Sequence, residues 1–247
     1  MKKIFVSDFD GTLFQNGEVS QEDLEAIHDF RKQGGLFGIA TGRMIGSIRN
    51  ALEMFDVPVD FVVGMNGGVT VDKHYNEIVN FPIGNDIGKE VANLLRDNGA
   101  IHYSISDGHN LCNQGNKSKN LRKYDRPCEE IFSNEVTGLH ASMSTIEAAR
   151  NACNLINEAY GEYVLALPNY AYIDVASNKV NKHIAIEMYL ENHGAVEVAT
   201  AGDAHNDLEM LKNYRGYAMR HGDEDIIHQI ELHVDTVSEA LEDFLKI

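Results

Sequence analysis

Two carboxylates stand one residue apart near the start of the chain, at Asp8 and Asp10. They follow a short apolar run, Ile4 to Val6, and precede Gly11, a pattern typical of a buried strand that ends in a turn. Side chains at positions i and i+2 of a strand point the same way. At roughly 4 Å and an effective dielectric of about 20, two like charges cost on the order of 4 kcal/mol. Unless this is only a strand-end and a turn aspartate, the pair needs a cation, as in a metal site, or a proton, as in acid catalysis.

Three further sites place polar side chains where the pattern predicts a strand end or a helix start. These sites are Thr41-Gly42, Lys182, and the segment Gly202-Asp203-Ala204-His205-Asn206-Asp207. Because ligands bind at the carboxyl ends of parallel strands, we expect the strand-end sites to converge there with Asp8 and Asp10. Four carboxylates in one cleft require a divalent cation, and an all-oxygen site suits Mg²⁺. The lysine and the hydroxyl suit a phosphate, whose charge Mg²⁺ would help to neutralise.

The elements that must position these residues change character twice along the chain. Apolar strand patterns and helical patterns alternate up to about residue 82, which is the signature of a parallel sheet covered on both faces. From Ile83 to Asn178 the pattern is α+β with antiparallel hairpins, and the alternation then returns. Thr41 and Lys182 are about 140 residues apart, whereas a βαβ unit needs about 30. We therefore predict a core domain, residues 1–82 and 179–247, interrupted by an inserted domain, residues 83–178.

Composition excludes several classes of protein. The chain has 247 residues, 43% of them hydrophobic, and a net charge of −17. Because nucleic-acid binders normally have a basic surface, we expect no nucleic-acid partner. No apolar run approaches the roughly 18 residues of a membrane span, so we expect a cytoplasmic protein with no membrane partner. Cys112, Cys128 and Cys153 form neither a zinc pattern nor a disulfide framework, which fits a reducing compartment.

Taken together, the four sites give the chain a family resemblance. It resembles a haloacid dehalogenase (HAD) superfamily phosphatase of the Cof-like branch with a type IIB cap. The matching motifs are, in order, Asp8-Phe9-Asp10-Gly11-Thr12-Leu13, Ala40-Thr41-Gly42-Arg43, Lys182, and the segment from Gly202 to Asp207. The resemblance covers the whole chain. It implies an α/β fold, with a Rossmann-like parallel-sheet core and an inserted α+β cap.

The resemblance also implies a role for each matched residue. Asp8 would be the nucleophile that forms an aspartyl-phosphate, and Asp10 would protonate the leaving alcohol and then activate water. Mg²⁺ would be held by Asp8, the backbone carbonyl of Asp10, Asp203 and Asp207. The phosphoryl oxygens would be bound by Thr41, Gly42, Lys182 and Asn206. The third motif is usually Lys-Gly, whereas the chain has Lys182-His183, and Lys179 is a rival for the phosphate-binding lysine.

Some residues outside these roles are candidates for substrate contact. Asn66 ends a predicted strand, and it either contacts substrate beneath the cap or only forms a tight turn. Arg43 either contacts substrate or forms a salt bridge on a helix. Within the polar loop from about Asp107 to Pro127, a basic stretch is either a solvated loop or an attractant for an anionic substrate. Its candidate contacts are Lys119, Arg122 and Lys123.

We therefore expect a Mg²⁺-dependent phosphatase that hydrolyses small phosphate monoesters such as sugar phosphates. The alternative within the same fold is a phosphotransferase or mutase of the phosphomannomutase-like type, which returns the phosphoryl group to its substrate. A further alternative is a non-enzymatic phosphate-binding or receiver-like signalling module. A receiver lacks an inserted cap, and a degenerate binding protein would have lost Asp8 or Asp10, which are both present.

Overall fold

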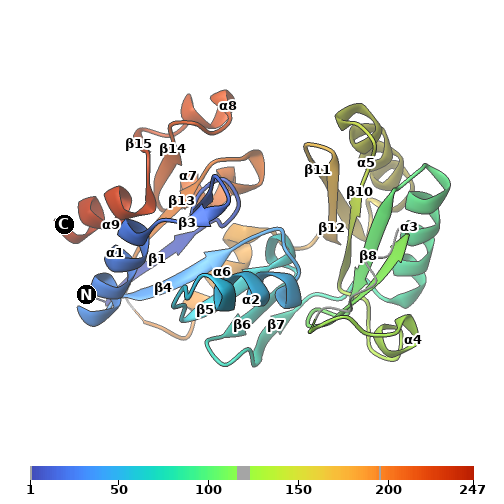
Figure 1. The fold of residues 1–247 in the computed structure, drawn as a ribbon, viewed down its shortest axis with the longest axis horizontal. Helices are drawn as coiled ribbons and strands as arrows, with labels where there is room; N and C mark the ends of the chain where they lie inside the picture. The colour runs from blue at the N-terminus through green and yellow to red at the C-terminus, as the bar shows by residue number, and fades with distance from the viewer. Residues whose placement is uncertain (1, 116–122, 195) are drawn as a thin grey trace.

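The structure, a computed structural model, describes residues 2–115, 123–194 and 196–247. Within these residues the strands form two large sheets and one two-stranded sheet (Figure 1). The larger one, the core sheet, has eight strands in the order β15-β14-β13-β1-β4-β5-β6-β7. These strands are β1 (Lys2–Ser7), β4 (Leu36–Ala40), β5 (Phe61–Gly64), β6 (Val69–Asp72), β7 (Glu77–Asn80), β13 (Val196–Gly202), β14 (Arg215–Met219) and β15 (Leu232–Val234).

The composition of β1 explains its place inside the core sheet. Its apolar residues Ile4 to Val6 are completely buried, as expected for a strand covered on both faces. β1 runs parallel to β13 and β4, which places Ser7 beside Ala201 and Ile39. The carboxyl ends of these three strands therefore meet at one edge. The prediction of a parallel sheet is confirmed from β15 through β5, whereas β6 and β7 are antiparallel additions.

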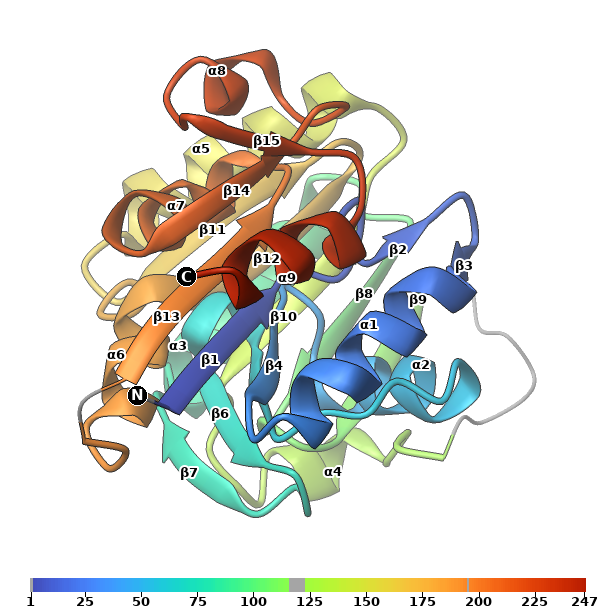
Figure 2. The same ribbon diagram turned by 90° about the vertical axis from the view of Figure 1, so that its left-hand side faces the viewer.

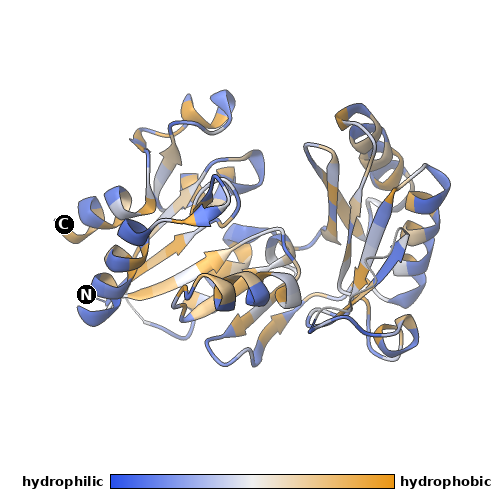
Figure 3. Ribbon diagram, viewed as in Figure 1, coloured by the Kyte–Doolittle hydropathy of each residue, from blue (hydrophilic) through white to orange (hydrophobic). Residues whose placement is uncertain are grey.

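Helices cover both faces of the core sheet. On one face, the cluster around Phe5 includes residues of α1, α2 and α9; on the other face, Ile4 packs with Ala185 of α6 and Met210 of α7. Figure 2 shows α1 and α9 side by side, and Figure 3 shows apolar residues concentrated in the strands. These helices are α1 (Gln21–Lys32), α2 (Ile45–Met54), α6 (Lys182–Leu190), α7 (Leu208–Asn213) and α9 (Val237–Leu245).

The second sheet lies entirely inside the predicted insertion. Its strand order is β11-β12-β10-β8-β9, and all neighbouring strands are antiparallel. Helices cover the face that is turned away from the core sheet (Figure 1), and we call this sheet with its helices the cap. Its elements are α3 (Asn85–Asp97), β8 (His102–Ser106), β9 (Leu111–Gly115), α4 (Cys128–Ile131), β10 (Gly138–Ser142), α5 (Ile146–Tyr160), β11 (Val164–Asn169) and β12 (Tyr172–Ser177). The proposed domain boundaries fall in the connections between β7 and α3 and between β12 and α6.

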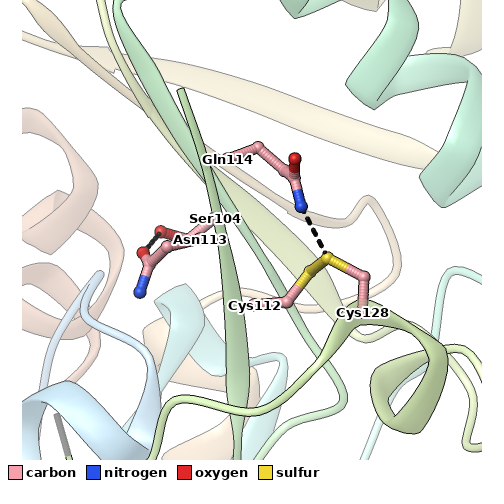
Figure 4. Close-up of a disulfide and its surroundings, with 5 residues drawn as sticks. All are labelled: Ser104, Cys112, Asn113, Gln114 and Cys128. Atoms are coloured by element: carbon pink, nitrogen blue, oxygen red, sulfur yellow. Dashed lines mark hydrogen bonds between the residues drawn. A yellow bond between two sulfur atoms is a disulfide. The ribbon is translucent and has the colours of Figure 1, made fainter. Parts of the chain in front are cut away.

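The cysteines differ from the expectation. Cys112 and Cys128 form a disulfide, whereas Cys153 is free and buried. The prediction of no disulfide is wrong because α4 packs against β9 and brings together two cysteines whose spacing fits no sequence pattern. Figure 4 shows the disulfide on one side of the cap sheet and the side chains of Ser104 and Asn113 on the other side.

Short elements connect the main ones. They are β2 (Phe14–Gln15), β3 (Glu18–Val19), η1 (Met65–Gly67), η2 (His205–Asp207) and α8 (Glu224–Ile227). The hairpin β2–β3 directly follows the first pair of carboxylates. Among the helices of the described residues, none combines the length and the apolar character that crossing a bilayer requires.

Candidate active site

A lysine joins two carboxylates from distant parts of the chain at the centre of the site. Lys182, the first residue of α6, donates hydrogen bonds from Nζ to Asp8 Oδ1 and Asp207 Oδ1, each 2.6 Å long. Its side chain is only 1% exposed. Asp8 directly follows β1, and Asp207 ends η2, the short helix after β13. Three separate segments thus meet at the carboxyl edge of the core sheet.

Burial and charge oppose each other in this cluster. Burial disfavours the ammonium of Lys182, but the charges of Asp207 and Asp8 outweigh burial and raise the pKa of Lys182. Burial raises the pKa of Asp8 well above its usual range, and the charge of Lys182 opposes that rise. Lys182 is therefore the group that favours the ionised form of Asp8.

A third carboxylate, Asp203, makes the cluster a candidate metal centre. Carboxylate oxygens of Asp8, Asp203 and Asp207 lie within 4.8 Å of one another. Burial, together with the charge of Asp207, raises the pKa of Asp203 to about 6. One ammonium does not balance three carboxylates, and a divalent cation would remove this imbalance. The donors are all carboxylate oxygens, which fits a hard cation.

The hydroxyl of Thr12 and the close approach of Gly11 set the orientation of Asp203. Thr12 Oγ1 donates a hydrogen bond of 2.7 Å to Asp203 Oδ1. Gly11 has a φ of +87°, and a Cβ at this position would lie 2.4 Å from Asp203 Oδ2, so the approach requires glycine. On the other side, the N–H groups of Asp203 and Ala204 donate to Asp207 Oδ2 at 3.1 Å each. The carboxylates are therefore positioned by hydrogen bonds within the protein itself.

Asp10 is paired with an arginine and is more exposed than Asp8. Arg43 donates from Nε to Asp10 Oδ2 at 2.6 Å and from Nη2 to Asp10 Oδ1. The side chain of Asp10 is 41% exposed, and the guanidinium also lies over the ring of Phe9. From the sequence, Arg43 either contacts substrate or forms a salt bridge on a helix. The structure shows an ion pair, formed with Asp10 rather than with a neighbour on a helix.

Thr41 and Gly42 follow β4 and lie at the boundary between core and cap. The buried hydroxyl of Thr41 accepts a hydrogen bond of 3.1 Å from the N–H of Arg43. Its own proton has no acceptor among the residues that the structure describes. A Cβ on Gly42 would lie 2.5 Å from Oδ2 of Asp174, a cap residue. Thr41 therefore keeps a proton to donate, and glycine at position 42 allows the cap to approach the core.

Asn66 and Asn206 contact each other at the same edge. Asn206 Nδ2 donates a hydrogen bond of 2.9 Å to Asn66 Oδ1. Asn66 has a φ of 53° and Met65 a φ of 55°, in the left-handed region that is uncommon for a residue such as methionine. Backbone strain of this kind clusters at functional sites. Asn66 therefore lies against the fourth motif, and its contact with substrate stays a prediction.

The remaining predicted contacts lie apart from this cluster or outside the described residues. Lys179 is exposed, so Lys182 rather than Lys179 lies among the carboxylates. Lys119 and Arg122 fall outside the described residues. Lys123 Nζ lies 2.8 Å from Glu53 Oε2 on α2, an ion pair between the cap and the core. That the basic loop contacts substrate stays a prediction.

Two residues that sequence reasoning missed lie on the cap face turned towards the core. His140 of β10 and Asp174 of β12 form a hydrogen bond of 2.8 Å between Nδ1 and Oδ1. Burial lowers the pKa of His140, but the hydrogen bond and charge of Asp174 outweigh burial and raise it. The charge of Arg43 lowers this pKa and the charge of Asp10 raises it, both less than Asp174 does. Polar residues alternate with apolar ones in both strands, and this alternation is the signal that could have found them.

Comparisons with known proteins agree with this geometry. A family model of haloacid dehalogenase-like hydrolases matches residues 5–240. The chain is similar to 5-amino-6-(5-phospho-D-ribitylamino)uracil phosphatase YwtE of Bacillus subtilis, with 31% identity over 110 residues, which are 44% of this chain and 37% of that protein. A second relative, YxeH of Bacillus subtilis, is 33% identical over 82 residues, and the matches span only 30% of YxeH and 37% of YwtE.

Solved structures resemble the whole chain. The HAD subclass IIB sugar phosphatase BT4131 has a TM-score of 0.77 and 22% identity, with 100% of both chains covered. TM0651 from Thermotoga maritima has a TM-score of 0.79 and 20% identity, with 98% of this chain and 97% of that chain covered. At these identities the likeness shows a shared fold, cap included.

Proposed function

The chain belongs to the haloacid dehalogenase-like hydrolase family, and on this premise we propose that it is a Mg²⁺-dependent phosphatase of small phosphate monoesters. The observation that carries the proposal is Lys182 held between Asp8 and Asp207 beside Asp203. This cluster combines a nucleophile, a cation for the phosphoryl group and a set of metal ligands in one place. Receiver-like signalling modules need no inserted cap, so the cap further favours an enzyme.

The carboxylates are the ligands that a metal would use. Asp8, Asp203 and the backbone carbonyl of Asp10 would hold Mg²⁺, with Asp207 supporting the site. When bound, Mg²⁺ would neutralise negative charge on the phosphate and its transition state. Asp207 has a second function, since it holds Lys182 through Oδ1 and the 203–204 backbone through Oδ2.

In the first step, Asp8 would attack the phosphorus of the ester. A bond forms between a carboxylate oxygen of Asp8 and phosphorus, and the bond from phosphorus to the ester oxygen breaks. Asp10 gives its proton to that oxygen, which leaves as an alcohol. The product on the enzyme is an aspartyl-phosphate. Covalent catalysis of this kind divides one difficult step into two easier ones.

In the second step, Asp10 would act as the base. Its carboxylate takes a proton from water, and the oxygen of that water attacks phosphorus. The bond between phosphorus and Asp8 breaks, and inorganic phosphate leaves. Asp8 is again a carboxylate and Asp10 is again protonated, so the cycle closes without any other reactant.

The phosphoryl oxygens would be bound by donors around Asp8. They are the hydroxyl of Thr41, the N–H of Gly42, the ammonium of Lys182 and the amide of Asn206. Donors that are already in place stabilise charge in the transition state without reorganising. Thr41 suits this role because its proton has no acceptor within the described residues, and Lys182 suits it because it is fixed by two carboxylates.

Two observations favour sugar phosphates and related metabolites as substrates. The cap reaches Gly42 through Asp174, which favours a small ester over a phosphoprotein. One relative is named as a phosphatase of a phospho-ribityl compound, and a structural neighbour is named as a sugar phosphatase. Both printed names describe phosphate esters on hydroxylated carbon chains.

The test is phosphate release from a panel of metabolite monoesters, with Mg²⁺ and with EDTA. We expect Mg²⁺-dependent release from a few sugar phosphates by the wild type and none by Asp8→Asn. Asp97→Asn, an exposed carboxylate on α3, is the matched control and should retain activity. Release by Asp8→Asn would refute the nucleophile. A wild type that acts only with a bisphosphate activator would indicate the mutase instead.

A further inference from the structure

One continuous row of side chains crosses all five strands of the cap on the face turned towards the core. The strand registers place these residues side by side: Leu167, Asp174, His140, Ser104 and Asn113. The adjacent row is apolar and lies in the cap interior: Ala166, Val175, Leu139, Ile105 and Cys112. Successive strand residues point to opposite faces, and Figure 4 shows this for Asn113 and Cys112.

Apart from Leu167, the row facing the core is polar, and its polar members are bonded in pairs. His140 and Asp174 form one pair at 2.8 Å, and Ser104 Oγ donates to Asn113 Oδ1 at 2.6 Å. The side chain of Asp174 is only 12% exposed. Polar groups at such positions are costly to bury, and apolar side chains would cover the core more favourably. A row of paired donors and acceptors is instead suited to hydroxyl groups of a ligand.

The row lies where the leaving group of the proposed reaction must lie. In an in-line displacement the leaving oxygen is opposite the attacking oxygen of Asp8, and it must be within reach of Asp10. Asp174 Oδ2 approaches Gly42, a proposed phosphate ligand, and His140 is hydrogen-bonded to the same carboxylate. The rest of the substrate therefore extends from the phosphate towards this part of the cap.

We infer that the pairs His140–Asp174 and Ser104–Asn113 form the leaving-group subsite and select a hydroxylated, uncharged leaving group. This inference rests on the proposed phosphatase function and specifies which part of the ester the cap recognises. Asp174 would accept hydrogen bonds from substrate hydroxyls, and His140 is held by Asp174 in one orientation. A site built to bind hydroxyls discriminates strongly against an analogue that lacks them.

The charges around this subsite disfavour a second anionic group on the substrate. Arg43 is already paired with Asp10, and Lys182 is already paired with Asp8 and Asp207. The His140–Asp174 pair contributes no excess positive charge. A carboxylate or second phosphate at this place would meet Asp174 without a free cation among the described groups of the row. A substrate with a single phosphate and neutral hydroxyls avoids that repulsion.

Two probes that differ in one group test the inference. Sorbitol 6-phosphate and 6-phosphogluconate share a hydroxylated chain, but the second ends in a carboxylate. We expect wild-type kcat/KM to be at least about tenfold higher for sorbitol 6-phosphate. Asp174→Asn should bring this ratio close to one, because the neutral amide no longer repels the carboxylate of 6-phosphogluconate. Asp97→Asn, the exposed cap control, should not change the ratio.

The possible outcomes distinguish a failure of the proposed subsite from a failure of the proposed reaction. His140→Asn tests the same pair, and it replaces Asp174→Asn should that variant fail to fold. A ratio unchanged in the folded variants would overturn the subsite while wild-type turnover upheld the phosphatase. A wild type that prefers 6-phosphogluconate would also overturn the inference. No phosphate release by the wild type from either probe, nor from p-nitrophenyl phosphate, would overturn the proposed function and the inference with it.

Discussion

Arg43 donates hydrogen bonds to both carboxylate oxygens of Asp10, so the proposed general acid and base is held by a guanidinium. The two residues come from the ends of adjacent strands, β1 and β4. Each carboxyl oxygen has two lone pairs, so a protonated Asp10 can donate to a leaving group while it accepts hydrogen bonds from Arg43. The pair sets the resting orientation of the acid.

Arg43→Lys tests this positioning. Lysine keeps the charge but not the two-pronged contact, so the substitution is not conservative here. We expect kcat to fall by about 10- to 100-fold because Asp10 is misplaced, with KM changed by less than about threefold. Arg49→Lys on α2 is the matched control, since Arg49 pairs with Glu53 on the same helix. A rise in KM with kcat unchanged would instead mean that Arg43 binds substrate.

Asp10→Asn tests the acid and base role itself. A positioned acid or base contributes about 10²- to 10⁴-fold, so kcat for a sugar phosphate should fall by that factor. The loss should be smaller for p-nitrophenyl phosphate, because p-nitrophenolate leaves without needing a proton. Steady-state kinetics on both substrates measure the difference. A loss below about tenfold on the sugar phosphate would argue against the role.

Lys182→Gln tests the central cation. Removing it leaves Asp8 and Asp207 buried without their partner, and breaking a buried ion pair costs about 3–5 kcal/mol. We expect the free energy of unfolding in EDTA to fall by about that amount, with phosphatase activity lost. Lys179→Gln is the control, and as an exposed substitution it should stay within about 0.5 kcal/mol of the wild type. Equal effects of the two substitutions would contradict the assignment of Lys182.

The raised pKa of Asp203 predicts a pH-dependent response to metal. Folding raises this pKa from 3.8 to about 6, so the associated stability is fully present below 3.8 and is lost as the pH rises through about 6. Asp8 acts in the same direction, because burial also raises its pKa. Lys182 stays protonated throughout this window. Metal-free protein should therefore lose stability from about pH 4 to about pH 6 as these carboxyls ionise.

Thermal unfolding with EDTA and with Mg²⁺ measures this response. Because Mg²⁺ binds the ionised carboxylates, the gain in Tm should be larger at about pH 7.5 than at about pH 5. Asp203→Asn should show a smaller gain and little difference between the two pH values. The same gain in the wild type at both pH values would contradict this account of Asp203.

The core of the site could be predicted from the sequence because each part is a short local pattern. Asp8, Thr41 and Asp203 each follow an apolar strand, and parallel strands place their carboxyl ends at one edge. The structure brings Asp8 and Asp203 together with Lys182 and Asp207. The pairing of Asp10 with Arg43 was not predictable, since the sequence allows several partners for an arginine at that position.

The cap could be predicted only in outline. β9 contains Asn113 and Gln114, and this polar composition makes it resemble a loop. His140 and Asp174 are single polar residues in strands 34 residues apart, with no motif around them. Their contact depends on which strands pair and in which register, and neither is set by local sequence. The same holds for the disulfide between β9 and α4.

Substitutions on the two faces of the cap sheet should have different effects on the enzyme. Positions in the row of His140 and Asp174 contribute nothing to the apolar interior, which is built from the alternate positions of the same strands. Redesign of the first set can therefore redirect the catalyst to a different ester without rebuilding the scaffold. Redesign of the second set would change expression and solubility before it changed selectivity. A library for altered substrate preference should thus randomise every second residue of β8, β10 and β12 and leave the intervening residues untouched.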